Sequence, residues 1–373
     1  YGMMSIQKKI LYFVLKICSL LLPFFPIKKN KVTFVTLTSD NLCYDFAQID
    51  KALKHEGGYD IHYILTTIHK TLWGQFSYFL NCIYQLFSIN TSSVVIINDN
   101  NYVISNFKRR GVHVIQIWHA CGAVKKFGNQ ISREYQIKDY DTILCTSEKW
   151  KPVYAEAFGV NENQVKVTGT PRSDLLFDKN YCEKLSQKLE YRYPQLKGKY
   201  VVLYAPTFRG NLVKGLRYEE IDIEKIAAQL PENFIILYRM HPLLKNVILG
   251  KANNVLNVSE DDLNELLARA DCFISDYSSL IFDYSILERK EIMYVPDLEQ
   301  YRKTLGLNID YSTIPAQVCF TEDELLKAIL DVDGWDREMV RDFKNVYFKY
   351  HDSKSVDRIV ELIHEFVYGT KQN

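Results

Sequence analysis

Short apolar runs alternate along this chain with helix-length stretches of mixed polarity, and this rhythm is the feature that most constrains its fold. The first apolar runs lie at 32–38, 61–66, 93–99 and 113–120. Between them, helices are expected near 44–56, 72–87 and 102–110. Because repeats of strand, helix and strand join parallel strands through crossover helices, the series predicts a doubly wound parallel sheet with helices on both faces.

The same rhythm continues through the rest of the chain. Further apolar runs lie at 141–147, 164–170, 200–206, 234–241, 255–260, 272–279 and 292–296. A charged, tyrosine-rich segment at 183–200 marks the domain boundary, and 373 residues suit two domains that each bury a core. We therefore predict an α/β chain with Rossmann-like domains at 31–185 and 186–352, and a C-terminal helix within 353–373 that packs back on the first domain.

The first 30 residues differ from the rest. The segment 10–27 is almost continuously apolar, is flanked by lysines and is short for a membrane span of roughly 20 residues. Lys9 and Lys16 lie one heptad apart on a helix, and a set of apolar side chains faces away from them: Leu11, Val14, Leu15, Cys18 and Leu22. This pattern predicts a membrane-associating helix within 1–30 that lies in the headgroup plane. A packed N-terminal helix and a true span are the alternatives.

The charge balance argues against a nucleic-acid-binding protein, and the cysteine spacing argues against a cysteine-ligated metal site. The 46 Lys and Arg nearly balance the 45 Asp and Glu, so the chain lacks the positive field of a nucleic-acid-binding protein. Its eight cysteines are scattered singly, without metal-ligand spacing, which is typical of reduced core residues. No D-x-D motif follows a predicted strand, so we expect no obligatory metal site.

Ligands of open α/β sheets bind at the carboxyl ends of the strands, and five polar clusters lie there. The first is His119, which follows an apolar strand and precedes Gly122, Lys125 and Lys126. Histidine exchanges protons near neutral pH, so His119 is either a general base or a histidine held under a loop.

Two clusters combine a turn with an arginine. Gly169, Thr170 and Arg172 follow the run at 164–170, and Thr207 and Arg209 follow the run at 200–206. Glycine allows the backbone to approach a ligand closely, and arginine can bind phosphate through two hydrogen bonds. Ordinary turns with solvated arginines would explain each cluster equally well.

The fourth cluster is Arg239 and His241. Strand alternation puts both side chains on one face, where they could address one anion. The fifth is the pair Ser278 and Ser279, between Asp276 and Asp283, which predicts a helix start with amides and hydroxyls available to an anion. Capping alone would explain the serines. It would not explain why two histidines and three arginines converge on the same edge.

Five ordered motifs together resemble the CDP-glycerol glycerophosphotransferase family, whose members build wall teichoic acids and related polymers. They are WHACGAVKKFG (118–128), VTGTPRSDLLF (167–177), LYAPTFRG (203–210), YRMHP (238–242) and ISDYSSLIFDYSILERKEIMYVPDLEQY (274–301). The resemblance runs from about residue 31 to about residue 310. It implies a GT-B fold, with two Rossmann-like domains facing a cleft, and peripheral, monotopic attachment to the cytoplasmic face of the membrane.

The resemblance also implies roles for individual residues. His119 matches the family's proposed general base, His241 and Arg239 match donor-phosphate contacts, and Ser278 and Ser279 match a pyrophosphate-binding helix start. His241 is a catalytic candidate together with His119, and Arg209, Thr170 and Arg172 are further candidates for binding the donor phosphates. Other candidates for the same site are Gly122, Lys125, Gly169, Thr207, Asp276 and Asp283. Family members commonly show WHGTPLK where this chain has WHACGAVKK, a difference that bears on acceptor or polyol preference.

The implied reaction transfers glycerol phosphate from CDP-glycerol to a hydroxyl of a lipid-linked saccharide, carried on undecaprenyl diphosphate, or of a growing teichoic acid or capsule chain. CMP is released and no cofactor is obligatory. A CDP-ribitol-dependent transferase, a GT-B glycosyltransferase using a nucleotide sugar and a non-catalytic membrane-bound scaffold are the alternatives. Primase action is favoured slightly over polymerase action, and a homo-oligomer is left open.

Overall fold

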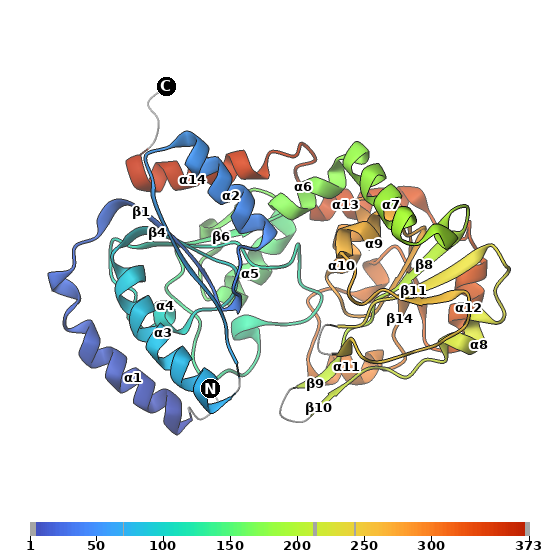
Figure 1. Cartoon of the computed structure of the whole chain (residues 1–373), viewed down its shortest axis with the longest axis horizontal. Helices are drawn as coiled ribbons and strands as arrows, with labels where there is room; N and C mark the ends of the chain where they lie inside the picture. Colours follow the sequence, from blue (N-terminus) through green and yellow to red (C-terminus); the bar gives the residue numbers. More distant parts are fainter. Residues whose placement is uncertain (1–4, 70, 212–214, 242–243, 370–373) are drawn as a thin grey trace. The chain divides into compact units, whose positions relative to one another are not determined.

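The computed structural model describes residues 5–69, 71–211, 215–241 and 244–369. The chain divides into two compact units (Figure 1). The first comprises Tyr1–His119, Phe127–Asp174 and Phe348–Asn373, and the second comprises Ala120–Lys126 and Leu175–Tyr347. The chain thus leaves the first unit at Asp174 and returns to it at Phe348, compared with the expected boundaries at 185 and 352.

The first unit is built on a seven-stranded sheet with the order β2-β3-β1-β4-β5-β6-β7. Its strands are β1 Lys28–Thr36, β2 Thr38–Ser39, β3 Asp60–Thr67, β4 Ser92–Ile97, β5 His113–Gln116, β6 Thr142–Cys145 and β7 Val165–Val167. All neighbouring strands pair in parallel except β2, which runs antiparallel to β3. Every residue of β4 is buried, as expected for a central parallel strand covered on both faces.

Helices cover this sheet and connect its strands. They are α1 Ile6–Ser19, α2 Tyr44–Glu56, α3 Leu72–Asn90, α4 Tyr102–Phe107, α5 Lys151–Phe158, α6 Pro171–Phe177, which spans the boundary at Asp174, and α14 Ser355–Tyr368. The C-terminal helix α14 contacts α2, β1 and β4, and it buries Ile359, Ile363 and Val367 in the core of the first unit (Figure 1).

The second unit contains a six-stranded parallel sheet with the order β12-β11-β8-β13-β14-β15. Its strands are β8 Tyr200–Tyr204, β11 Phe234–Tyr238, β12 Val255–Asn257, β13 Cys272–Ser275, β14 Lys290–Tyr294 and β15 Gln317–Cys319, and a hairpin adds β9 Arg209–Asn211 and β10 Gly215–Arg217. Its helices are α7 Lys179–Arg192, α8 Ile223–Ala227, α9 Leu263–Arg269, α10 Leu280–Ser285, α11 Leu298–Thr304, α12 Glu322–Leu330 and α13 Arg337–Tyr347. The predicted α/β class with parallel, Rossmann-like sheets is confirmed.

The N-terminal helix α1 packs on α3 and α4 (Figure 1). Leu11, Leu15 and Leu22 are buried, so these side chains, which the sequence assigned to the membrane, belong to the protein core. A different apolar face remains exposed, formed by Ile6, Ile10, Phe13 and Ile17. Within the described residues, none of the helices combines the length and the apolar character that a membrane crossing requires.

Glu291 is a buried carboxyl group in β14. Its side chain is 2% exposed, and neither of its oxygens has a hydrogen-bond partner in the described part of the chain. Burial, with a smaller contribution from the charge of Asp283, raises the pKa of Glu291 well above its ordinary value. The folded protein therefore keeps Glu291 protonated at a pH where the unfolded chain ionises it, and the free energy of unfolding falls as pH rises above about 4.3.

We expect Glu291→Met to raise the free energy of unfolding at neutral pH by about 1–3 kcal/mol, because it removes a buried polar group without partners. The gain should shrink near pH 4, and thermal unfolding at both pH values measures it. Glu265→Met is the matched control, since the equally buried Glu265 binds Lys188 at 2.5 Å and Arg192 at 2.8 Å and its loss should destabilise. A Glu291→Met protein less stable than the parent at pH 7 would contradict this prediction.

Candidate functional site

The turn after β5 presents His119 on a strained backbone. Trp118 has a φ of +58°, in the left-handed region that bulky residues rarely adopt. Its amide donates a hydrogen bond to Gln116 Oε1 at 2.8 Å, and its buried ring stacks on Phe127 at 4.9 Å between centroids. Such backbone strain persists only where the surroundings enforce it, and it is often found at functional sites.

The hydrogen bond of the His119 ring fixes its tautomer. Nδ1 lies 3.2 Å from the carbonyl oxygen of Asn98, at the end of β4. A carbonyl oxygen can only accept, so Nδ1 carries the proton and donates it to this bond. In the neutral ring Nε2 is therefore unprotonated, as a general base requires.

The surroundings of His119 favour this neutral form. Desolvation of the ring lowers its pKa below the ordinary 6.5, the nearby Asp99 and the Asn98 carbonyl raise it, and Arg172 lowers it. The residue as a whole is exposed, so water still reaches the ring, and the net change in its pKa is a decrease. His119 is then mostly an unprotonated base at neutral pH.

Arg172 lies in the first turn of α6, where Asp45 of α2 positions it. The backbone amide of Arg172 donates to Asp45 Oδ1 at 2.8 Å, and its Nε lies 3.9 Å from Asp45 Oδ2. Burial raises the pKa of Asp45, although Arg172 opposes the shift. Because Arg172 influences the pKa of His119, the first unit brings these two predicted site residues together.

Gly169 and Thr170 have structural partners in the same turn. Gly169 has a φ of +77°, and a Cβ added there would lie 2.3 Å from Ser355 Oγ at the start of α14. The Thr170 hydroxyl donates to Ser173 Oγ at 2.9 Å inside the first turn of α6. The glycine is thus required for the close approach of α14, and a contact of either residue with phosphate stays a prediction.

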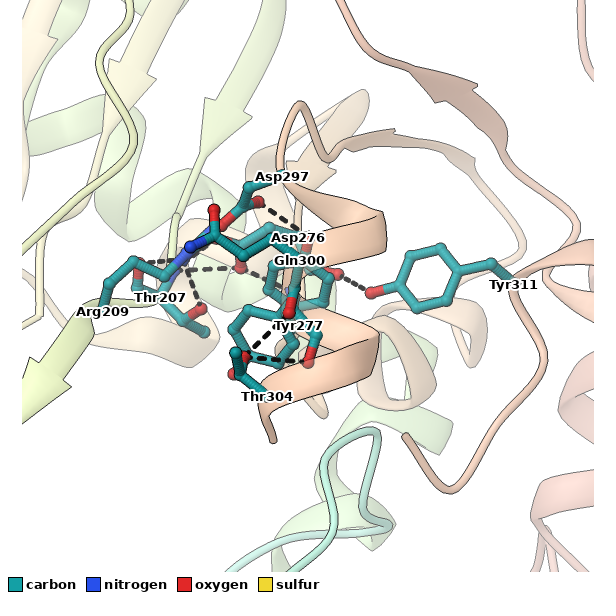
Figure 2. Close-up of polar contacts among 9 residues, drawn as sticks. Thr207, Arg209, Asp276, Tyr277, Asp297, Gln300, Thr304 and Tyr311 are labelled. Atoms are coloured by element: carbon teal, nitrogen blue, oxygen red, sulfur yellow. Dashed lines mark hydrogen bonds and ion pairs between the residues drawn. The ribbon is translucent and has the colours of Figure 1, made fainter. Parts of the chain in front are cut away.

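Arg209 of the second unit lies between two carboxylates (Figure 2). Its Nη1 donates to Asp276 at 3.0 Å, and its Nε donates to Asp297 at 2.8 Å. Asp276 also accepts from the amide of Thr207 at 3.0 Å, so it fixes the loop after β8. Burial opposes the charge of Arg209, but the hydrogen bonds and charges of Asp297 and Asp276 outweigh it and raise the pKa.

Three tyrosines complete this network. The rings of Tyr277 and Tyr301 stack with centroids 3.6 Å apart, and the guanidinium of Arg209 lies 4.9 Å from the Tyr277 ring. The Tyr277 hydroxyl donates to Asp297 at 2.8 Å, and the Tyr311 hydroxyl donates to the carbonyl of Asp276 at 2.5 Å (Figure 2). One arginine between two carboxylates leaves a net negative charge, so this network positions loops better than it attracts phosphate.

Basic side chains also gather around Phe208. The Lys125 ammonium lies 6.0 Å from the Phe208 ring, and the His241 ring meets Phe208 edge to face at 4.6 Å. Burial lowers the pKa of His241, and the charges of Lys125 and Arg239 lower it further. The Arg239 Nε is buried and has no hydrogen-bond partner among the described residues. Lys125, Arg239 and His241 together are called the cationic cluster below. The lysine and the arginine carry its charge, and the largely neutral His241 ring can add a hydrogen bond, so the cluster suits an anion.

The serine pair follows β13. The amide of Leu280 donates to Ser278 Oγ at 3.2 Å, and the Ser279 side chain makes no capping bond to the helix α10 that it precedes. Because α10 has only six residues, its dipole adds little, and the hydroxyls are the more useful donors. Asp283 in α10 accepts from Cys121 Sγ at 3.1 Å, next to Gly122 in the loop of the WHACG motif. Pro242 of the YRMHP motif lies outside the described residues.

Several residues of the site were missed in the sequence. Asp99 and Asp297 each follow a strand of the parallel sheets, and the rule that selected the other clusters could have found them. Phe208 and Asp45 gave no such signal, because their importance comes only from neighbours distant in sequence. Among the described residues, no three His, Cys, Asp or Glu side chains form a group that could hold a metal ion.

Comparisons with known proteins agree with this architecture. The sequence profile of the family described as CDP-Glycerol:Poly(glycerophosphate) glycerophosphotransferase matches residues 17–365. The chain is 32% identical over 358 residues to the teichoic acid ribitol-phosphate polymerase TarL of Staphylococcus aureus, an alignment that covers 90% of this chain but only 63% of that protein. It is 30% identical over 371 residues to a teichoic acid ribitol-phosphate primase of Bacillus spizizenii, covering 93% and 94% of the two chains.

A solved structure of the wall teichoic acid polymerase TagF superposes on this chain with a TM-score of 0.75, at 21% identity, and covers 95% of this chain and 93% of that one. At this identity the match shows a shared fold. The resemblance of the five motifs is confirmed, because the family profile spans nearly the whole chain. The chain belongs to the CDP-glycerol:poly(glycerophosphate) glycerophosphotransferase family.

Proposed function

We propose that this protein transfers a polyol phosphate from a CDP-activated donor to a hydroxyl of a saccharide or polyol-phosphate acceptor and releases CMP. The observation that carries the proposal is the geometry of His119. Its Nδ1 proton is held by the Asn98 carbonyl, so Nε2 can take the proton of an acceptor hydroxyl. Arg172, which lies near this base, would bind a phosphate oxygen of the substrate.

The cationic cluster of Lys125, Arg239 and His241 would bind the two phosphates of the donor, with the hydroxyls of Ser278 and Ser279 on the same sheet edge. The first unit would then serve the acceptor and the second unit the donor. The acceptor oxygen attacks the phosphorus that carries the polyol, and its proton passes to His119. The bond from that phosphorus to the bridging oxygen breaks, and CMP leaves with the electron pair. Phosphoryl transfer of this kind depends mostly on positioning and on charge stabilisation.

The polyol is glycerol or ribitol. Family membership supports CDP-glycerol, whereas the two relatives above are ribitol-phosphate enzymes by name, which makes CDP-ribitol a specific second candidate. Purified protein incubated with each donor and an acceptor should release CMP from one of them well above the rate of donor hydrolysis. Release of a nucleoside diphosphate from a nucleotide sugar instead would favour the glycosyltransferase alternative.

Attachment to the cytoplasmic face of the membrane would bring this reaction to a lipid-linked acceptor. Ile6, Ile10, Phe13 and Ile17 recur at helical spacing on the exposed side of α1, with Phe13 64% exposed. The neighbouring α3 exposes Leu72, Trp73, Phe76, Leu80 and Tyr84. Two adjacent helices with exposed apolar faces suit a monotopic protein whose helices lie in the headgroup plane.

We expect the double substitution Ile10→Glu and Phe13→Glu to abolish binding to vesicles that contain anionic phospholipid, because it places two charges in the buried part of the interface. Co-sedimentation with vesicles measures the bound fraction. Tyr191→Glu is the control, since Tyr191 is 90% exposed on α7 of the other unit. Unchanged binding of the double variant would show that this face does not contact lipid.

A further inference from the structure

A cavity of about 320 Å³ lies in the second unit, where β14 and β15 begin. Residues from three segments line it, 290–291, 314–317 and 334–339, and every residue of these segments is described. Its volume lies at the lower end of the range for ligand pockets, roughly 300–1,000 Å³. The polar clusters of the candidate site follow the carboxyl ends of the strands, and the five residues of β14 span roughly 17 Å. The cavity is therefore a separate site at the other edge of the sheet.

Glu291 gives this cavity a buried carboxyl group without a partner. The residue is 2% exposed, and neither of its carboxyl oxygens forms a hydrogen bond within the described part of the chain. The preceding Lys290 turns to the other face of the strand, where its ammonium donates to the carbonyl of Ala328 in α12 at 2.6 Å. Since side chains alternate along a strand, Glu291 lies on the face that α10 and α13 cover. Burial, and then the charge of Asp283 in α10, raise its pKa.

This unpaired carboxyl group calls for a physical explanation. Buried polar groups in folded proteins nearly always have hydrogen-bond partners, and each exception destabilises the fold. Natural proteins keep such features chiefly at functional sites. A ligand that supplies the missing partners of Glu291 when it binds would explain why the residue is there.

The rest of the lining suits a cation with an apolar body. Trp335 is half-buried and Met339 is 56% exposed, so both offer apolar contact near the mouth, and the face of an indole attracts positive charge. Asp336 adds a second carboxylate. Its Oδ1 accepts from the amides of Glu338 at 2.9 Å and Met339 at 3.1 Å, so these amides at the start of α13 are not available to an anion.

The basic side chains of α13 do not neutralise Glu291, because they have other partners. Arg341 and Lys344 both bind Glu288. The Arg337 guanidinium lies 5.6 Å from the indole ring of the lining and does not itself line the cavity. A positively charged ligand would therefore meet a carboxyl group that no cation among the described residues already binds.

We propose that this cavity binds a small organic cation, a primary ammonium group on a short apolar chain. The ammonium donates hydrogen bonds to the Glu291 carboxylate, and the apolar chain packs against Trp335 and Met339. On binding, Glu291 gives its proton to the solvent, because a cation in contact with a carboxyl group favours the ionised form. The site does not depend on the transfer reaction proposed above.

n-Butylammonium is a suitable probe, because it carries one ammonium group on a short apolar chain. n-Butanol and butyrate have the same chain length and serve as the neutral and the anionic comparison. In ligand-observed NMR titrations of the full chain at pH 7, n-butylammonium should bind about tenfold more tightly than either of them, since its hydrogen bonds to Glu291 are charged. It should also raise the Tm of the wild-type protein, as a ligand of the folded state does.

Substitutions at Glu291 test its role directly. Glu291→Gln keeps the shape of the side chain but cannot ionise, and it should weaken n-butylammonium binding about tenfold. Glu291→Met should abolish the preference for n-butylammonium over n-butanol, and because this variant is expected to be more stable than the parent, that loss would not come from unfolding. Trp335→Ala should weaken binding about fivefold. Glu338→Gln, at an exposed carboxylate of α13 outside the lining, is the matched control and should leave binding unchanged.

Three results would overturn this inference. The first is a wild-type protein that does not bind n-butylammonium. The second is equal binding of n-butanol and n-butylammonium, which would show a cavity that takes any small solute and a carboxyl group that water satisfies. The third is n-butylammonium binding that neither Glu291→Gln nor Glu291→Met weakens, which would place the cation elsewhere on the protein.

Discussion

Replacing His119 by alanine is expected to lower kcat for polyol-phosphate transfer by about 10²–10⁴-fold, the usual contribution of a general base. The donor should still bind, because its phosphates are assigned to cations of the second unit. The pH profile adds a second readout. The pKa of His119 is shifted below 6.5, so the unprotonated base persists to lower pH. The midpoint of the acid limb of kcat/KM should therefore lie below pH 6.5.

Steady-state rates and donor binding, measured from pH 5 to pH 8, test this expectation. His55→Ala is the control, because His55 is an exposed histidine of α2 outside the site. The His119→Ala protein should lack the acid limb altogether. An acid limb that persists in this variant, or a kcat equal to that of the wild type, would assign the base to another residue.

The second large effect is expected at Arg239. Its Nε is buried without a hydrogen-bond partner among the described residues, so the guanidinium is available to a donor phosphate. We expect Arg239→Ala to lower kcat/KM for the CDP-polyol by about 10²–10³-fold, as found when a group that stabilises developing charge is removed. Arg239→Lys should recover only part of this loss, because an ammonium cannot form the paired hydrogen bonds of a guanidinium.

Kinetics at varied donor concentration measure the effect, with the acceptor KM as an internal reference. Arg302→Ala is the matched control, since Arg302 is a surface arginine paired with Glu299 one helical turn away at 2.9 Å. If Arg239→Ala and Arg302→Ala gave the same kinetics, the cationic cluster would not be the donor site.

Much of the fold follows from local sequence patterns. The helix expected at 44–56 is observed as α2 Tyr44–Glu56, and the run at 93–99 becomes the fully buried strand β4. These elements depend on apolar periodicity, which the sequence displays directly. Which face of α1 is buried did not follow from its sequence. A helix that is apolar over most of its surface does not reveal which face meets the protein and which remains exposed.

The site was less predictable because its contacts join distant residues. His119, Arg172, Arg239 and His241 could be selected from their places after strands. That Arg209 binds Asp297, 88 positions away in the sequence, could not be inferred from the motif that contains it. The same applies to Glu291, whose missing hydrogen-bond partners depend on the packing of three-dimensional neighbours.

The mass of the acceptor after reaction tests the central claim most directly. Purified protein is incubated with CDP-glycerol, and separately with CDP-ribitol, together with an acceptor that carries a disaccharide, and the products are analysed by mass spectrometry. The proposed function predicts that the acceptor gains the mass of one or more polyol-phosphate units, with one CMP released per unit. An acceptor unchanged with both donors but extended by a sugar from a nucleotide sugar would contradict it.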